Sequence, residues 1–353
     1  MKVAPLARAF RHCDNVRHMI VHTGQHYDAA MSDVFFRDLE IPEPDIFLGV
    51  GSGSHAEQTA KIMTAFERVV ADIRPDAVIV VGDVNSTLAC SIVCAKMSVP
   101  VAHVEAGLRS FDRTMPEEIN RLVTDAIADW LFVSEPSGVE NLKREGAGDE
   151  KIFFVGNVMI DTLVMYRERH AAPPILSDLG LSSKKYVLMT MHRPGNVDTR
   201  EDLERLVRLI NRITEKSTVV FPMHPRTKKM LASFDLAGTL SARCQGTEPL
   251  AYGEFITLCE HAACVVTDSG GIQEETTFLG VPCITLRPNT ERPVTVTEGT
   301  NTLMGDRYDD VPLAIDTMVI GHEKKGTIPA LWDGHAADRI AEILYNKLSG
   351  NYV

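Results

Sequence analysis

Several features that would assign this 353-residue chain to a particular class are missing from it. No apolar run approaches the ~20 residues that a membrane-spanning helix needs, and we find no secretory signal. The formal net charge of -12 argues against duplex nucleic acid as a partner, because a phosphate backbone selects basic surface. Short-period repeats and low-complexity tracts are also lacking. We therefore expect neither a membrane nor a nucleic-acid partner.

Patterns typical of metal sites are missing as well. The seven cysteines form no C-x-x-C pair, and most of them lie in apolar runs. The twelve histidines include no H-E-x-x-H pattern. We expect reduced core cysteines, a cytoplasmic location and no bound metal.

What is present is an alternation of strand-like and helix-like segments. Hydrophobic residues make up 44% of the chain and charged residues 24%, as in a globular protein. Residues 77–81, 99–104 and 264–266 are short apolar runs, whereas Leu203, Leu206, Ile210 and Ile213 keep helical spacing. Such alternation predicts parallel sheets in a doubly wound α/β architecture, with helices on both faces.

The length allows two domains, and the loose segment Ala171-Ala172-Pro173-Pro174 marks a boundary between two alternating series. We predict one domain over residues 1–170 and a second over residues 171–334. A final helix within residues 335–353 is expected to pack back on the first domain.

One turn is the strongest candidate for ligand binding. The apolar run 264–266 stops at Ser-Gly-Gly (residues 269–271), and a carboxylate-rich helix start follows. Backbone N–H groups at a helix N-terminus favour phosphate, and glycine lets a diphosphate come close. Glu275, one helical turn further on, could accept hydrogen bonds from ribose hydroxyls. The alternative is an ordinary junction with Asp268 or Ser269 as its N-cap.

Polar side chains also follow other apolar runs, where ligands bind in open α/β sheets. The candidates are Gln25, His26, Asp83, Glu105, His192, Arg193, His224, Arg226 and Arg292. Asp83 could instead cap a helix, and Glu117-Glu118 after Pro116 fits an ordinary first helical turn. Phosphate donors in the second domain and carboxylates in the first suit a nucleotide-sugar and proton transfer.

At this level of detail the chain resembles the non-hydrolysing UDP-N-acetylglucosamine 2-epimerases over nearly its whole length. The motifs that carry the resemblance are Gly24-Gln25-His26, Val81-Gly82-Asp83, His103-Val104-Glu105-Ala106-Gly107-Leu108-Arg109, Pro116-Glu117-Glu118-Ile119-Asn120-Arg121, Gly156-Asn157, His192-Arg193, the segment 268–275 and Thr290-Glu291-Arg292-Pro293. The resemblance implies a glycosyltransferase-B-like fold of two Rossmann-like domains with the site between them, and a homodimer.

The resemblance also implies a reaction. The proton on C2 of the sugar is removed and UDP is expelled from C1, which leaves a bound 2-acetamidoglucal; UDP then adds back after C2 is reprotonated on the other face. By match to the family, the acid/base candidates are Asp83, Glu105 and Glu117, and His192 is a further catalytic group. The matching UDP-binding positions are Lys2, Phe255, Ser269, Gly270, Gly271, Glu275 and Arg292. This chemistry needs neither a metal nor a redox cofactor.

The chain departs from the family pattern at its start. The family begins with a strand and a Gly-x-Arg-Pro loop, whereas here Val3, Leu6, Ala7 and Phe10 already keep helical spacing. We expect the first strand of the N-terminal domain to be missing, which would expose apolar surface on its neighbours. An upstream extension is expected to raise the melting temperature or the activity.

Two further departures concern specificity. Gly195 replaces a glutamate that many relatives carry, which bears on a possible regulatory site lined by Gln25, His26 and Arg193. The loop 51–55 could admit a modified hexose, such as a UDP-diacetamido-uronate. A retaining glycosyltransferase, a hydrolysing epimerase and an inactive UDP-sugar-binding protein remain as alternatives.

Overall fold

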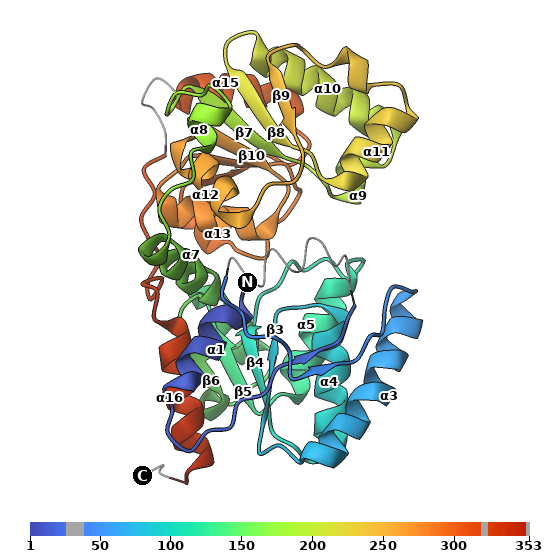
Figure 1. Ribbon diagram of the computed structural model, residues 1–353, viewed down its shortest axis with the longest axis vertical. Helices are drawn as coiled ribbons and strands as arrows, with labels where there is room; N and C mark the ends of the chain where they lie inside the picture. The colour runs from blue at the N-terminus through green and yellow to red at the C-terminus, as the bar shows by residue number, and fades with distance from the viewer. Residues whose placement is uncertain (26–38, 319–323, 351–353) are drawn as a thin grey trace. The chain divides into compact units, whose positions relative to one another are not determined.

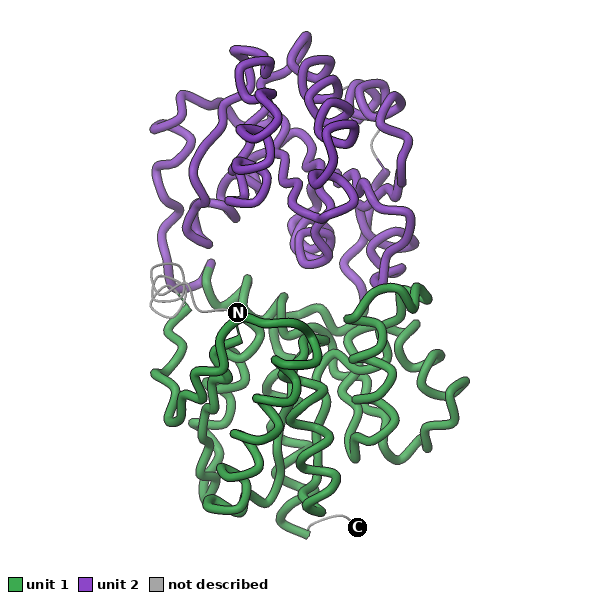
Figure 2. Tube along the Cα trace, turned by 90° about the vertical axis from the view of Figure 1, so that its right-hand side faces the viewer, with its two compact units in different colours: residues 1–166, 330–353 green, residues 167–329 purple. Residues whose placement is uncertain are grey.

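The computed structural model describes residues 1–25, 39–318 and 324–350 of the chain. They form two compact units (Figure 2), unit 1 from residues 1–166 with 330–353 and unit 2 from residues 167–329. Both units are built on parallel strands, as the alternation predicts. No helix in the described ranges is long and apolar enough to cross a membrane.

Unit 1 contains the elements drawn from blue to green in Figure 1, together with the C-terminal helix drawn in red. Its strands are β1 (Val21–His22), β2 (Ile46–Phe47), β3 (Val78–Val81), β4 (Val101–Ala106), β5 (Trp130–Val133) and β6 (Ile152–Phe154). Its helices are α1 (Val3–Arg11), α3 (His55–Ile73), α4 (Asn85–Lys96), α5 (Pro116–Ile127), α6 (Pro136–Arg144), the 3-10 turn η1 (Asp149–Lys151), α7 (Val158–Arg169) and α16 (Ala336–Leu348).

The sheet of unit 1 is interrupted. Strands β3, β4, β5 and β6 form one parallel sheet in that order, and β1 pairs only with β2. Val21 of β1 nevertheless packs on the same apolar cluster as Val80 of β3 and Val101 of β4. The chain opens on α1 as predicted, and no strand among the described residues joins β1 to β3.

Local sequence signals explain where elements of unit 1 begin and end. Ser54 and Glu57 form a capping box at the start of α3, each side chain accepting from the other's backbone N–H. Arg74, in the left-handed region, ends the same helix. All six residues of β4 are buried, as expected for a strand covered on both faces.

The C-terminal helix α16 belongs to unit 1. Ile340 and Leu344 of α16 are buried in one cluster with Leu6 and Phe10 of α1. Just before α16, the indole Nε1 of Trp332 donates a hydrogen bond to the carbonyl of Ser134 at 2.9 Å. These contacts lie within unit 1, on the other face of its sheet from α3 and α4.

Unit 2 has six parallel strands. They are β7 (Tyr186–Thr190), β8 (Thr218–Pro222), β9 (Cys244–Thr247), β10 (Cys264–Thr267), β11 (Cys283–Thr285) and β12 (Asn301–Leu303). The helices are α8 (Ile175–Asp178), α9 (Pro194–Val197), α10 (Arg200–Thr214), α11 (Pro225–Ser233), η2 (Ala237–Thr239), α12 (Tyr252–His261), α13 (Gly270–Leu279), α14 (Val294–Thr297), η3 (Tyr308–Asp310) and α15 (Val311–Thr317).

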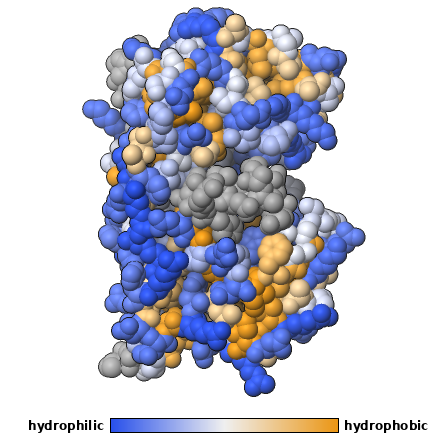
Figure 3. Space-filling model, in the orientation of Figure 1, coloured by the Kyte–Doolittle hydropathy of each residue, from blue (hydrophilic) through white to orange (hydrophobic). Residues whose placement is uncertain are grey.

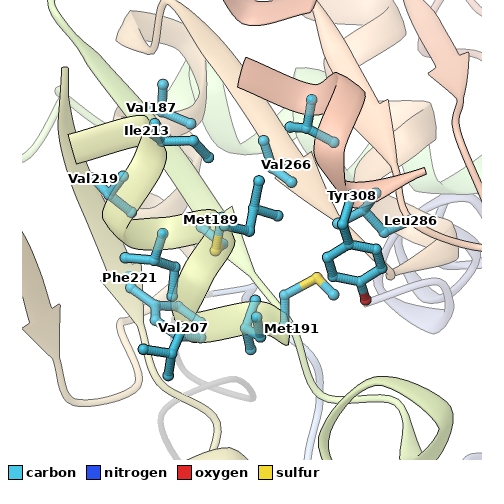
Figure 4. Packing of buried hydrophobic residues seen from close by; sticks show 14 of the residues in the cluster. Val187, Met189, Met191, Val207, Ile213, Val219, Phe221, Val266, Leu286 and Tyr308 are labelled. Atoms are coloured by element: carbon cyan, nitrogen blue, oxygen red, sulfur yellow. The ribbon is translucent and has the colours of Figure 1, made fainter. Parts of the chain in front are cut away.

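The sheet of unit 2 is doubly wound, with the strand order β12-β11-β10-β7-β8-β9. Apolar clusters cover both of its faces. Figure 4 shows one of them, in which Met189, Phe221 and Val266 of the strands pack with Val207 and Ile213 of α10. Residues that differ by one position along a strand point to opposite faces, so Leu188 and Val265 lie in the other cluster.

Candidate active site

The strand order of unit 2 creates a natural ligand position. The chain runs outward from β7 to β9 and then returns to place β10 on the other side of β7, so the direction reverses between β10 and β7. The two strands end together, with Thr190 paired in register to Thr267. In open α/β sheets, ligands bind outside the carboxyl ends of strands at such a reversal. His192 and Asp268 follow these two strand ends.

Asp268 binds the segment after β7 through several hydrogen bonds. Its fully buried carboxylate lies 3.0 Å from Nδ1 of His192 and accepts from the backbone N–H groups of His192 and Arg193. Asn196 donates its side-chain N–H to Oδ2 at 3.0 Å. Burial alone would raise the pKa of Asp268, but the hydrogen bonds from His192, Asn196 and Arg193 outweigh it and lower this pKa.

This contact determines which ring nitrogen of His192 is available. A carboxylate only accepts, so Nδ1 of His192 carries the proton that faces Asp268, and Nε2 remains for a ligand. The His192 side chain is 39% exposed, which leaves it accessible. His224, the N-cap residue of α11, lies beside it with ring centroids 5.4 Å apart. Burial, then the charges of His192 and Arg226, lower the pKa of His224.

The Ser-Gly-Gly turn opens α13 as predicted. Ser269 is the N-cap residue, yet its side chain makes no cap hydrogen bond in the described part of the chain. Its own N–H donates to Oγ1 of Thr267 at 3.0 Å. The first N–H groups of a helix have no intrahelical acceptor, so the turn can receive an anion. A side chain at Gly270 would meet Nη1 of Arg292 and Oε1 of Glu291 at 2.9 Å, so it would have to displace this ion pair.

Arg292 lies beside this turn in a buried chain of alternating charges. Its Nε is 2.7 Å from Glu274 and its Nη1 is 2.7 Å from Glu291. Arg287 donates to the second oxygen of Glu291 at 2.8 Å. Burial opposes ionisation of Glu291, but the two arginines hold its pKa well below its usual range. Two anions, Glu274 and Glu291, thus fix the Arg292 guanidinium next to Gly270.

Glu275 lies in the interior of unit 2 beside Tyr252. Oε1 lies 3.1 Å from the hydroxyl of Tyr252, and the residue is 3% exposed. Burial, with a smaller contribution from Glu274, raises the pKa of Glu275 to about 8 against the opposing hydrogen bond from Tyr252. A ribose hydroxyl pair would supply donors that favour the charged form.

In unit 1, Asp83 follows β3 and is bound by α5. Arg121 pairs with its carboxylate, and Asn120 donates to its backbone carbonyl at 2.8 Å. The N-cap residue of α4 is Val84, without a side-chain cap, so the capping alternative for Asp83 is wrong. The Asp83 side chain is 30% exposed and can reach a ligand.

Glu105 is strained and buried. The sequence predicts that Glu105 follows the end of a strand, but β4 continues to Ala106. The register between β4 and β5 shifts at Glu105. Glu105 has φ +73°, a conformation that costs a non-glycine residue about 1–3 kcal/mol. Oε2 pairs with Lys2, whereas Oε1 is buried with no hydrogen-bond partner among the described residues. A buried polar atom without a hydrogen bond needs an explanation, and a ligand donor or a proton on the carboxylate would satisfy Oε1 of Glu105.

Glu117 and Glu118, in the first turn of α5, lie in different environments. Glu117 is exposed. Glu118 is 1% exposed and accepts from the backbone N–H groups of Ser110 and Phe111 and from Arg121. Burial opposes its ionisation, but these donors lower the pKa of Glu118. Both glutamates lie in the first turn of α5, but only Glu118 has these structural contacts; Glu117 stays a catalytic prediction without a contact to Asp83 or Glu105 in the described part of unit 1.

The remaining predicted residues lie as follows. Lys2 is the N-cap residue of α1 and contacts Glu105. Phe255 is half-buried on α12, whose Tyr252 contacts Glu275. Gln25 accepts from Oγ of Ser86 at 2.7 Å. Arg193 is the N-cap residue of α9, and His26 lies outside the described residues.

Sequence reasoning missed the residues that hold the candidates in place. Arg121 binds Asp83, Asp268 orients His192, and Glu274 and Glu291 hold Arg292. Some signal was available, since Arg121 lies one helical turn after Glu117 in a motif rich in charge. What no pattern showed is which opposite charges meet across different strands and helices.

The fold and these residues define a class: an enzyme of nucleotide-sugar chemistry built on two Rossmann-like units. The profile of the UDP-N-acetylglucosamine 2-epimerases matches residues 8–345, and the chain belongs to this family. The predicted family, enzyme class and glycosyltransferase-B-like fold are confirmed.

The relatives can be aligned with this chain over nearly its full length. The UDP-N-acetylglucosamine 2-epimerase of Methanocaldococcus jannaschii is 41% identical over 98% of this chain and 96% of its own. Its crystal structure in complex with UDP-GlcNAc and UDP superposes with a TM-score of 0.89. A UDP-2,3-diacetamido-2,3-dideoxy-D-glucuronate 2-epimerase from Pseudomonas aeruginosa is 38% identical, with 98% and 96% covered. The Neisseria meningitidis enzyme bound to UDP-GlcNAc is 28% identical over 98% and 96%, with a TM-score of 0.85.

Proposed function

We propose that this chain interconverts UDP-N-acetylglucosamine and UDP-N-acetylmannosamine by inversion at C2, without hydrolysis. The observation that carries the proposal is the state of Glu105, a buried carboxylate in a strained backbone with one oxygen lacking a partner among the described residues. Strained residues of this kind cluster at active sites and ligand-binding positions. The UDP-GlcNAc bound in the Methanocaldococcus structure supports the choice of substrate.

The proposed reaction has two balanced stages. A carboxylate takes the C2 proton, the C2–H electron pair forms the C1–C2 double bond, and the C1–O bond breaks with its electrons leaving on UDP. A second group then delivers a proton to the opposite face of C2 while a UDP oxygen bonds to C1. Each of the two faces of C2 needs an acid/base group. Asp83, Glu105 and Glu117 are the three candidates that we propose for these two roles. The assignment of each carboxylate to a face stays open.

Unit 2 is proposed to hold the UDP. The N–H groups of Ser269, Gly270 and Gly271 and the Arg292 guanidinium would meet the diphosphate, whose negative charge grows as C1–O breaks. Glu275 would accept from the ribose, and Phe255 would lie near the base. His192 presents Nε2 toward a ligand because Asp268 occupies Nδ1, so it can donate to or accept from the leaving diphosphate.

One experiment tests this function against its rivals. UDP-GlcNAc is incubated with the protein in deuterium oxide and followed by proton NMR. The proposal requires loss of the C2 proton signal and appearance of UDP-N-acetylmannosamine without any acceptor. Free N-acetylmannosamine would indicate a hydrolysing epimerase, turnover only with an acceptor would indicate a glycosyltransferase, and an unchanged C2 signal would indicate a binding protein.

A related sugar is the second candidate. The diacetamido-uronate 2-epimerase from Pseudomonas aeruginosa is nearly as similar to this chain as the Methanocaldococcus enzyme. The same NMR assay with UDP-2,3-diacetamido-2,3-dideoxy-glucuronate compares kcat/KM for the two sugars. A higher value for the uronate would replace the first substrate and keep the reaction.

A homodimer is also proposed, and α5 supports it. This helix buries polar residues, among them Glu118, Arg121 and Asp125, while Ile119 and Val123 are each 36% exposed. Figure 3 shows apolar surface around the place where Figure 1 draws α4, the helix that packs beside α5. An apolar face that turns outward is typical of a surface that another chain covers. A second copy of this chain is the occupant that we propose.

Two finer expectations remain proposals. The seven free cysteines support a cytoplasmic location, where thiols stay reduced. A regulatory UDP-sugar site would involve Gln25, His26 and Arg193. Isothermal titration with UDP-GlcNAc distinguishes one binding site per chain from two.

A further inference from the structure

A buried histidine in unit 1 contacts the backbone beside the proposed catalytic carboxylates. His103 lies on β4, two residues before Glu105, and it is 0% exposed. Its Nδ1 is 2.6 Å from Oδ1 of Asp125 on α5, and its Nε2 is 2.9 Å from the carbonyl oxygen of Gly82. Both partners only accept hydrogen bonds, so both ring nitrogens must carry protons.

The charges around the ring favour this state. Burial alone would lower the pKa of His103, but Asp125, the Gly82 carbonyl and the nearby Glu105 outweigh burial and raise it. Asp125 is itself buried beside Arg109, whose Nη1 lies 2.7 Å from Oδ2. The ring is thus an imidazolium between two acceptors.

The same pair of residues reaches both sides of Glu105. Oδ2 of Asp125 accepts the backbone N–H of Gly107 at 3.0 Å, and Oδ1 binds the His103 ring. His103 and Gly107 flank the positive-φ residue Glu105 by two positions on each side. Through Nε2, His103 also holds Gly82, which directly precedes Asp83. One buried cluster therefore contacts the backbone at two strand ends.

We propose that the His103–Asp125 pair is a positioning element for proton transfer at C2, holding the backbone around Asp83 and Glu105 in the geometry that the reaction needs. This inference rests on the proposed function. Neither residue touches the substrate; each acts through the backbone of Gly82 and Gly107. A pair that served only the stability of the core would change folding without changing the chemical step.

The test compares His103→Gln and Asp125→Asn with Ser91→Ala, which removes a buried hydrogen bond to Thr87 elsewhere in unit 1. The amplitude of the thermal unfolding transition followed by circular dichroism, which reports on both units, measures the folded fraction in each preparation. Corrected for that fraction, kcat and C2 deuterium exchange should fall about tenfold or more in both variants, with KM and UDP affinity within about threefold of the parent. Ser91→Ala should keep the parent kcat.

Several outcomes would overturn the proposal. One is a corrected kcat within about threefold of the parent in either folded variant. Another comes from 15N NMR of the unmodified protein with labelled histidine, where His103 should show both ring nitrogens protonated; a neutral tautomer contradicts the geometry even if the variants do not fold. If the unmodified protein does not exchange the C2 proton for deuterium, the proposed function is wrong. The 15N NMR result still tests whether both ring nitrogens of His103 are protonated.

Discussion

The carboxylate of Asp268 lies 3.0 Å from Nδ1 of His192 and joins the ends of two adjacent strands of unit 2. The aspartate follows β10 and the histidine follows β7, and their positions differ by 76 in the chain. This contact orients the imidazole and determines its tautomer. It shows how a doubly wound sheet assembles a functional pair from distant segments.

Asp268→Asn is expected to lower kcat by about tenfold to a hundredfold, because an amide can turn its N–H toward Nδ1 and select the wrong tautomer. The measurement is kcat for epimerisation, with circular dichroism to verify folding. Asp198→Asn, which breaks an exposed pair with Arg226, serves as the control and should leave kcat unchanged. Equal kcat values for the two variants would contradict the role of Asp268.

Glu105→Gln is expected to abolish detectable C2 exchange while the protein remains folded. The amide keeps the size of the side chain and removes its ability to take a proton. Its pair with Lys2 is buried at the Glu105 carboxylate, so the free energy of unfolding should fall by about 1–3 kcal/mol, which leaves the protein folded. Urea denaturation and NMR exchange measure the two effects, and retention of exchange would refute the assignment.

Glu117→Gln and Glu118→Gln should affect different properties. The exposed Glu117 is a proposed acid/base group, so its variant should lose activity and keep its stability. Glu118 accepts two backbone N–H groups and Arg121, so its variant should lose about 1–3 kcal/mol of stability. Melting curves and kcat distinguish them; a stability loss confined to Glu117→Gln would reverse the assignment.

Glu275 should make stability depend on pH. Its pKa is raised from 4.5 in the unfolded chain to about 8 in the folded one. The folded state therefore holds an extra proton between these values, and its stabilising contribution is present below pH 4.5 and is lost as pH rises toward 8. Glu275→Gln should flatten this decline in melting temperature. The exposed Glu201→Gln should leave the pH dependence as it is, and an unchanged profile in Glu275→Gln would contradict the prediction.

Val123→Asp on α5 is expected to convert the proposed dimer to a monomer, because a charge would be buried in the contact. Light scattering after size exclusion measures the mass. Leu313→Asp, an equally apolar and more exposed position of unit 2, is the matched control and should not change the mass. A Val123→Asp protein with the mass of the parent would place the interface elsewhere.

Much of the architecture could be predicted from local pattern. The apolar run 264–266, the turn 269–271 and the helix after it appear in the structure as β10 and α13. The family followed from several motifs in the right order. Such features depend on residues close in sequence, where periodicity and turn chemistry act directly.

Other parts of the candidate site could not be predicted in this way. The positive φ of Glu105 coincides with the register shift between β4 and β5, and that register depends on how two strands pair. The difference between Glu117 and Glu118 depends on which side of α5 faces the Ser110 backbone.

The amino-acid order alone therefore determined the alternation of strands and helices, the anion-binding turn and the membership of a family, because these are set by neighbours in the chain. Only the tertiary structure decided which charges pair: Asp268 with His192, Asp83 with Arg121, and His103 with Asp125. The physical reason is that hydrogen bonds and ion pairs act over a few ångströms, and folding is what brings distant residues within that range.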